Sequence, residues 1–198
     1  MTRRRLPLEK VLLGFLMQGP LHGYDLHRRV ETELGNVWRM GMGHIYNTLK
    51  ELERGGHVES MVLPQENRPS RKVYRITPEG KRSFLTWVRQ PVPAVRDMRV
   101  EFPAKLYFFH LLNLDGVFRL IAAQEAACRR RLERMEKNAK RYGRHDFNRL
   151  VFDFRRRQIE AVLDWLADCR ETWATWRAAV QKGNAHESQV EWKAAPPS

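Results

Sequence analysis

Apolar residues at helical spacing, interrupted by glycine, organise the first third of the chain. The spacing predicts a helix over residues 7–18 that a Gly-Pro pair ends, a second over residues 21–34 and a third over residues 42–54, the last two each closed by glycine. The apolar positions are Leu8, Leu12, Phe15 and Leu16, then Leu21, Leu26, Val30 and Leu34, then Ile45, Leu49 and Leu52. Three short helices with glycine-containing turns predict a helix-turn-helix.

The third helix has a polar face opposite its apolar stripe. That face carries Gly43, Tyr46, Asn47, Lys50 and Arg54, while the carboxylates of Glu51 and Glu53 fall to the sides. A face with cationic and amide groups fits the DNA major groove, because phosphates attract Lys and Arg and base edges accept contacts from Asn or Lys. The alternative is an ordinary amphipathic helix that serves packing alone.

Two segments after the third helix alternate apolar and polar residues, which predicts β-strands. They cover residues 57–63 and 72–77, and the stretch between them is rich in turn formers and carries Arg68 and Arg71. A Thr-Pro pair then begins a fourth helix that ends near residue 90. The order of three helices and two strands with a basic tip is that of a winged helix-turn-helix. In that fold the third helix enters the major groove and the wing lies beside the flanking backbone.

The second half of the chain is predicted to be helical throughout. A proline-containing linker over residues 91–97 separates a winged domain of residues 1–90 from a helical region of residues 98–181. The first helix of that region begins near Pro103 and ends near Leu112. The fold class is therefore mainly α with a small β-wing, in which a winged helix-turn-helix precedes an all-helical dimerisation domain.

Two longer helices each carry an apolar seam with the alternating three- and four-residue spacing of coiled coils. The first seam is Phe118, Ile121, Glu125, Cys128, Leu132, Met135, Ala139 and Tyr142, and the second is Phe147, Val151, Phe154, Gln158, Val162, Trp165, Cys169, Trp173 and Trp176. Because Gly143 allows a turn, the two helices are expected to form a hairpin whose remaining apolar surface binds a second copy. Residues 182–198 lose the periodicity and are expected to be a flexible tail.

The charge of the chain points to a polyanionic partner. Its 198 residues have a formal net charge of +13 and a pI near 10.3, and the excess of Lys and Arg is shared between both halves, so nucleic acid is the expected partner. Two cysteines are too few for a disulfide framework, no apolar run is long enough to cross a membrane, and the N-terminus has no secretory signal pattern. We expect a cytoplasmic protein.

Three blocks of the sequence resemble the PadR family of transcriptional regulators. They are LLGFLMQGPLHGYDL, IYNTLKELERGGHVES and NRPSRKVYRITPEGK, in the order and spacing of that family. The resemblance implies a homodimeric DNA-binding protein, usually a repressor, in the subgroup with a large helical C-terminal domain. One departure is Asn47, where many members carry proline, and this change should alter local contacts and leave the fold intact.

The resemblance also implies residue roles. Carried over by position, it implies that Tyr24, Tyr46 and Lys50 contact DNA and that Arg71 and Lys72 lie in the wing. Together with the polar face and the basic tip, the candidate DNA-binding residues are Tyr24, Gly43, His44, Tyr46, Asn47, Lys50, Arg68, Arg71 and Lys72.

Several further features have two interpretations. The arginine runs at residues 129–131 and 155–157 could touch DNA, although such runs usually form solvated faces. The aromatics Phe108, Phe109, Phe154 and Trp165 are the candidate wall of a pocket for a small aromatic effector, with Arg155 or Arg156 pairing with a ligand carboxylate, although aromatics at helical spacing usually pack. Cys128 and Cys169 could pair as a redox switch, although buried cysteine behaves mostly as a small hydrophobe.

The function predicted from these features is that of a sequence-specific transcriptional regulator, a ligand-responsive homodimeric repressor that needs no cofactor. No spacing of His, Cys, Asp or Glu predicts a metal site, and no catalytic constellation is present, so we expect no enzyme activity. The alternative is a co-regulator whose winged domain binds DNA only beside a partner. An RNA-binding module is disfavoured because the aromatic sheet face or GXXG loop of such domains is missing.

Overall fold

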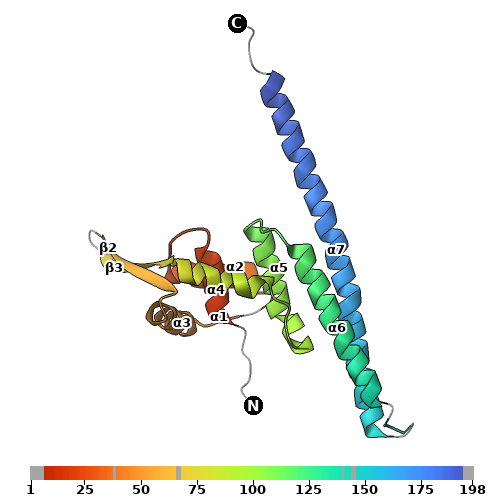
Figure 1. Ribbon diagram of the computed structural model, residues 1–198. Coiled ribbons are helices and arrows are strands. Elements are labelled where there is room, and N and C mark those ends of the chain that lie inside the picture. Colours follow the sequence, from red (N-terminus) through yellow and green to blue (C-terminus); the bar gives the residue numbers. More distant parts are fainter. Residues whose placement is uncertain (1–6, 38, 66–67, 140, 144–145, 194–198) are drawn as a thin grey trace. The chain divides into compact units, whose positions relative to one another are not determined.

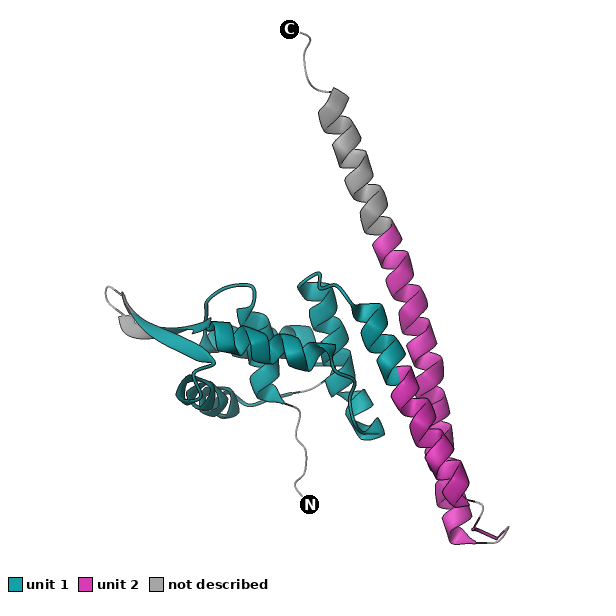
Figure 2. Ribbon diagram, in the orientation of Figure 1, with its two compact units in different colours: residues 1–124 teal, residues 125–198 magenta. Residues whose placement is uncertain are grey.

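The computed structural model describes residues 7–37, 39–65, 68–139, 141–143 and 146–193, and it describes side chains within these ranges except at 63–71 and 179–193. The chain divides into two compact units, residues 1–124 and residues 125–198 (Figure 2). The elements in order are α1 (Leu8–Leu16), β1 (Leu21–His22), α2 (Gly23–Leu34), α3 (Met42–Arg54), β2 (Val58–Gln65), β3 (Arg68–Ile76), α4 (Pro78–Arg89), η1 (Val95–Arg99), α5 (Glu101–Leu111), α6 (Val117–Ala139) and α7 (Phe147–Lys193) (Figure 1).

Helix α1 is the centre of the first unit. Every residue from Val11 to Leu16 is buried, because α3 and α4 pack around it. Gly14 makes the closest approach, since a Cβ built there would lie 2.5 Å from the Phe108 ring of α5 and 2.7 Å from the Phe84 ring of α4. The core of the winged domain therefore includes α5, which follows the predicted linker.

The sheet has three antiparallel strands in the order β1-β3-β2, where the sequence predicts a hairpin of two. Leu21 of β1 pairs with Tyr74, and Ser60 of β2 pairs with the same residue from the other side. Strand β1 was missed because two residues between Pro20 and Gly23 are too short to show alternation. The predicted cap of α4 is confirmed: the Thr77 hydroxyl accepts a hydrogen bond from the Gly80 amide, 3.1 Å.

The predicted linker is held in place at its N-terminal end. The Val92 amide donates to the Gln124 side-chain oxygen, 2.7 Å, and the Gln124 amide donates back to the Val92 carbonyl, 3.3 Å. The Lys105 ammonium, almost fully buried, donates to the Gln90 carbonyl, 2.7 Å, and pairs with Glu101, 3.1 Å. The chain enters η1 at Val95, and the division between compact units falls after Gln124, well beyond this segment.

The second unit contains most of α6 and all of α7. The α6 seam corresponds to the less exposed side of that helix, with Cys128 and Ala139 buried. Glu125, the polar interruption of the seam, accepts two hydrogen bonds of 2.8 Å from Arg170 of α7. The antiparallel pair of helices is therefore tied by an ion pair where the apolar pattern breaks.

The apolar seam predicted on α7 is only partly the face that packs inside the chain, since Val151, Val162 and Cys169 are half-buried. The buried residues are Phe152, Ile159 and Leu166, at a spacing of seven, whereas Phe154 and Trp165 are exposed. Periodicity locates apolar positions but cannot say which of two neighbouring stripes packs within the chain. In addition, α7 continues to Lys193, past the predicted end at residue 181. In the described part of the chain, none of the helices is both long enough and apolar enough to cross a lipid bilayer.

Candidate nucleic-acid interface

Helix α3 separates a buried face from an exposed one, as its periodicity predicts. Ile45, Leu49 and Leu52 are at most 3% exposed, and Thr48 joins them. Of the predicted polar face, Gly43, Tyr46, Asn47, Lys50 and Arg54 are all exposed, and His44 is half-buried beside them. A Cβ built at Gly43 would meet no atom within 4 Å, so no packing within the described chain requires glycine there.

The two tyrosines implied by the family resemblance come together at the start of α2. A Cβ built at Gly23 would lie 2.6 Å from the Tyr46 ring, so the ring rests directly on the first turn of α2. Tyr24, the next residue, is 61% exposed, and Tyr46 is 39% exposed. Glycine at position 23 thus lets the Tyr46 ring of α3 approach the first turn of α2 closely.

The wing lies beside the C-terminal end of α3 and is joined to it by a polar cluster. Glu53, in the last turn of α3, accepts a hydrogen bond from the Ser60 hydroxyl of β2 and another from the Lys72 ammonium of β3, 2.7 Å. Sequence reasoning placed Lys72 in the wing but missed Glu53 and Ser60, because helical and strand periodicity says nothing of contacts between elements. Arg68 and Arg71 belong to β3, but their side chains lie outside the described residues.

The cluster changes the acidity of its members. The hydrogen bond from Lys72 lowers the pKa of Glu53 below its ordinary value, and the same bond raises the pKa of Lys72. Burial raises the pKa of Tyr74, whose ring centroid lies 5.3 Å from the Lys72 ammonium. At neutral pH both Glu53 and Lys72 are therefore ionised.

Comparison with known proteins agrees with this geometry. The family model of the transcriptional regulator PadR-like family matches residues 12–85, which contain α3, the wing and both tyrosines. Residues 12–85 are therefore similar to transcriptional regulators of the PadR-like family. A second family model, virulence activator alpha C-term, matches residues 98–174.

Relatives of the PadR-like segment include named regulators. The chain is 31% identical over 106 residues to the negative transcriptional regulator PadR of Bacillus subtilis, covering 54% of this chain and 58% of that protein. It is 30% identical over 92 residues to the probable transcriptional regulator Rv1176c of Mycobacterium tuberculosis, covering 46% and 49%. The chain thus spans about half of the length of these relatives.

Solved structures similar to the chain include a PadR protein and a PadR-like regulator. The structure of Bacillus subtilis PadR in complex with operator DNA is 24% identical, covering 82% of this chain and 96% of that chain with a TM-score of 0.44. A PadR-like transcriptional regulator, BC1756 from Bacillus cereus, is 26% identical, covering 87% and 98% with a TM-score of 0.42.

The four aromatics of the predicted effector pocket are divided between the two units. Phe108 and Phe109 are packed in the core of the first unit, where the Phe108 ring contacts the rings of Phe15 and Phe84 at centroid distances of 5.3 Å. Phe154 and Trp165 are exposed on α7 in the second unit. Phe108 and Phe109 thus follow the packing interpretation of the sequence.

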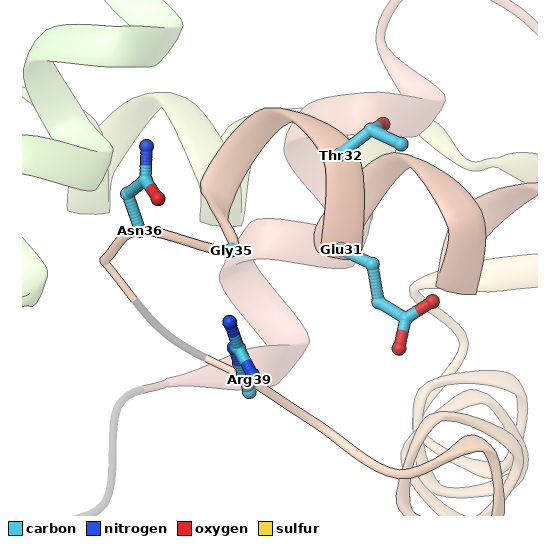
Figure 3. Close-up of a pocket in the computed structure, with 5 residues that line it drawn as sticks. All are labelled: Glu31, Thr32, Gly35, Asn36 and Arg39. Atoms are coloured by element: carbon cyan, nitrogen blue, oxygen red, sulfur yellow. The ribbon is translucent and has the colours of Figure 1, made fainter.

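A recess of about 250 Å³ in the PadR-like segment lies at the end of α2 (Figure 3). It is lined by Glu31, Thr32, Gly35, Asn36 and Arg39, and none of the predicted pocket aromatics belongs to it. Its walls carry a carboxylate, a guanidinium, a hydroxyl and an amide, so it lacks the apolar lining that an aromatic ligand requires.

The two cysteines are free thiols within the helical unit. Cys128 is buried and Cys169 is half-buried, and burial raises the pKa of Cys169 to about 11, with the charge of Asp168 adding to the shift. A thiol with so high a pKa is a poor nucleophile at neutral pH.

Proposed function

We propose that this protein is a homodimeric, sequence-specific DNA-binding regulator of transcription, a repressor that responds to a small aromatic effector. The observation that supports DNA binding most directly is the exposed face of α3, with Tyr46, Asn47 and Lys50 beside the wing in a PadR-like segment. Lys50 and Asn47 can reach base edges, and exposed Tyr24 and Tyr46 can donate to phosphates. Gly43 and His44, at the start of α3, allow the backbone to approach DNA closely.

The wing supplies the flanking contacts in this proposal. Arg68 and Arg71, in β3, are the residues expected to neutralise phosphates beside the groove. Repression is supported by similarity to a negative regulator, PadR of Bacillus subtilis.

The dimer is supported by an apolar face of α7 that stays largely exposed among the described residues. Five large side chains are 37–73% exposed, namely Phe147, Leu150, Phe154, Trp165 and Trp176. At 3.6 residues per turn they fall within an arc of about 80°, roughly a third of a turn from the buried stripe of Phe152, Ile159 and Leu166. A second copy of α7 would cover this face symmetrically.

The effector is expected to be a planar aromatic compound that binds against the ring of Phe154 or of Trp165 where the two copies of α7 meet, with Arg155 or Arg156 pairing with a carboxylate. Tryptophan fluorescence titrated with aromatic acids and planar cations, beside release from DNA, tests this part. Quenching of tryptophan fluorescence together with release from DNA supports the effector. Quenching without release, or no response, assigns the aromatics to packing.

Selection of genomic fragments by the purified protein tests DNA binding itself. The proposal predicts enrichment of sites with two-fold symmetry whose half-sites lie about one helical turn apart. A protein that shifts its own promoter fragment only after a second protein is added would be the co-regulator instead.

A further inference from the structure

Three elements of the candidate interface meet at one carboxylate. Oxygen Oε2 of Glu53, in the last turn of α3, lies 2.7 Å from the Lys72 ammonium of β3. Oxygen Oε1 accepts the hydroxyl hydrogen bond of Ser60 in β2. Ser60 of β2 also pairs with Tyr74 of β3 in the sheet. The cluster therefore ties both strands of the wing to α3.

The Lys72 ammonium is already occupied on two sides. It donates to Glu53 and lies 5.3 Å from the centroid of the Tyr74 ring, so a carboxylate and a ring face both stabilise its charge. A phosphate approaching this ammonium would also meet the negative charge of Glu53. The neutralised pair contributes little to the attraction of a polyanion, although the side chains of Lys72 and Glu53 are 41% and 33% exposed.

Resting on the proposed DNA-binding function, we propose that Lys72 is a positioning residue rather than a phosphate contact: bound to Glu53, it fixes the wing against the end of α3 so that the helix and the wing tip engage one DNA site together. This changes the role of Lys72, which the sequence placed among the candidate DNA-binding residues. It also explains why a carboxylate, that of Glu53, lies beside a DNA-binding face.

Two substitutions distinguish positioning from phosphate contact, Lys72→Met by its salt dependence and Glu53→Gln by the sign of its effect. In Lys72→Met, which keeps the apolar stem, affinity for the selected site should fall roughly threefold more than affinity for unrelated DNA, because the carboxylate left unpaired at Glu53 weakens both alike. The salt dependence should keep its slope, whereas loss of a phosphate contact would reduce the slope by about 0.9. In Glu53→Gln, affinity for the selected site should also fall, although a negative charge has been removed from the interface.

The double variant and a matched control complete the design. Lys72→Met with Glu53→Gln should bind no more weakly than the weaker single variant, since both changes break one interaction. Arg75→Gln is the control, because Arg75 lies on the same strand and pairs with Glu59 of β2 at 2.8 Å, without reaching α3. Its ratio of specific to non-specific affinity should equal that of the unaltered protein.

Amide hydrogen exchange without DNA separates failure of this inference from failure of the proposed function. Exchange at residues 51–56 should accelerate in Lys72→Met and Glu53→Gln but not in Arg75→Gln, whether or not the protein binds DNA. A protein that selects no DNA site but shows this exchange pattern loses the proposed function and keeps the Glu53–Lys72 coupling. A salt slope reduced by about 0.9 in Lys72→Met, tighter binding by Glu53→Gln, or unchanged exchange overturns the inference.

Discussion

Gly14 lies where three helices of the first unit meet, and its missing side chain is a packing requirement. A Cβ at this position would come within 2.7 Å of the Phe108 and Phe84 rings, both fully buried. Neither ring can move without disturbing the aromatic cluster of Phe15, Trp87 and Tyr107 around it. The residue therefore links α1 to α4 and α5.

Gly14→Ala should lower the free energy of unfolding by about 1–3 kcal/mol, the usual cost of overpacking a core. Urea denaturation of the full chain measures it. The matched control is Gly43→Ala in α3, where a Cβ meets no atom within 4 Å and the gain in helix propensity should leave stability unchanged or slightly raised. Equal stability of the two variants would contradict the packing described for Gly14.

The half-buried Cys169 thiol should be unreactive in the folded protein. Because burial raises its pKa to about 11, the thiolate fraction at pH 8 is on the order of one in a thousand, about a hundredfold below that of a thiol at the ordinary value of 9.0. Alkylation by iodoacetamide, followed by mass spectrometry, should be slow at pH 8 and accelerate steadily as the pH rises toward 11. Rapid alkylation at pH 7.5 would contradict the shift and reopen the redox interpretation of the cysteines.

At the scale of the elements, α5 shows that the linker predicted at residues 91–97 is fixed by contacts that its sequence pattern does not reveal. Prolines forbid regular structure at Pro91 and Pro93, and the pattern correctly indicates an irregular segment at residues 91–94, although η1 begins at Val95 inside the predicted linker. Yet Gln124 and Lys105 hold the backbone at Val92 and Gln90, and Phe108 fills the core beside α1. The segment is irregular and fixed.

A fragment that ends at residue 90 should therefore fold poorly, because it lacks Phe102, Phe108 and the partner groups of the linker. A fragment that ends at residue 124 retains them. Circular dichroism during heating should show a cooperative transition for residues 1–124 and a broad or much lower transition for residues 1–90. A residue 1–90 fragment as stable as the longer one would show that α5 is dispensable to the winged domain.

Sequence patterns predicted the elements well where one face of an element decides its packing. Ile45, Leu49 and Leu52 were placed on the buried side of α3, and Thr77 was placed at the cap of α4, because each depends on neighbours within the same few residues. The contacts of Glu53 with Ser60 and Lys72 were missed, since they join residues 7 and 19 positions apart through tertiary structure. On α7 two apolar stripes lie side by side, and only packing shows that Phe152 faces inward while Phe154 faces outward.

On the scale of the whole molecule, positive charge and uncovered apolar surface point to two different partners. The net charge of +13 favours a polyanion, while the exposed apolar side chains of α7 favour a second protein surface. We infer that DNA is bound by α3 with the wing and that a second copy covers α7.

Replacing Phe154 by glutamate tests the assembly, because it places a charge in the middle of the exposed α7 face without touching the buried stripe. Sedimentation velocity should show a dimer for the unaltered chain and a shift toward monomer for Phe154→Glu. The control is Arg130→Glu, on the exposed charged side of α6, which should remain dimeric. A monomeric unaltered chain, or an undisturbed Phe154→Glu dimer, would place any interface elsewhere.

The central claim, that the exposed face of α3 reads DNA sequence, is tested most directly by fluorescence anisotropy of the full chain on its selected fragment and on a scrambled one. Lys50→Ala should weaken binding to the selected fragment by about 1–3 kcal/mol, roughly five- to 150-fold, and should change binding to the scrambled fragment much less. Equal losses on both fragments, or no loss on either, would contradict the assignment of α3 to the major groove.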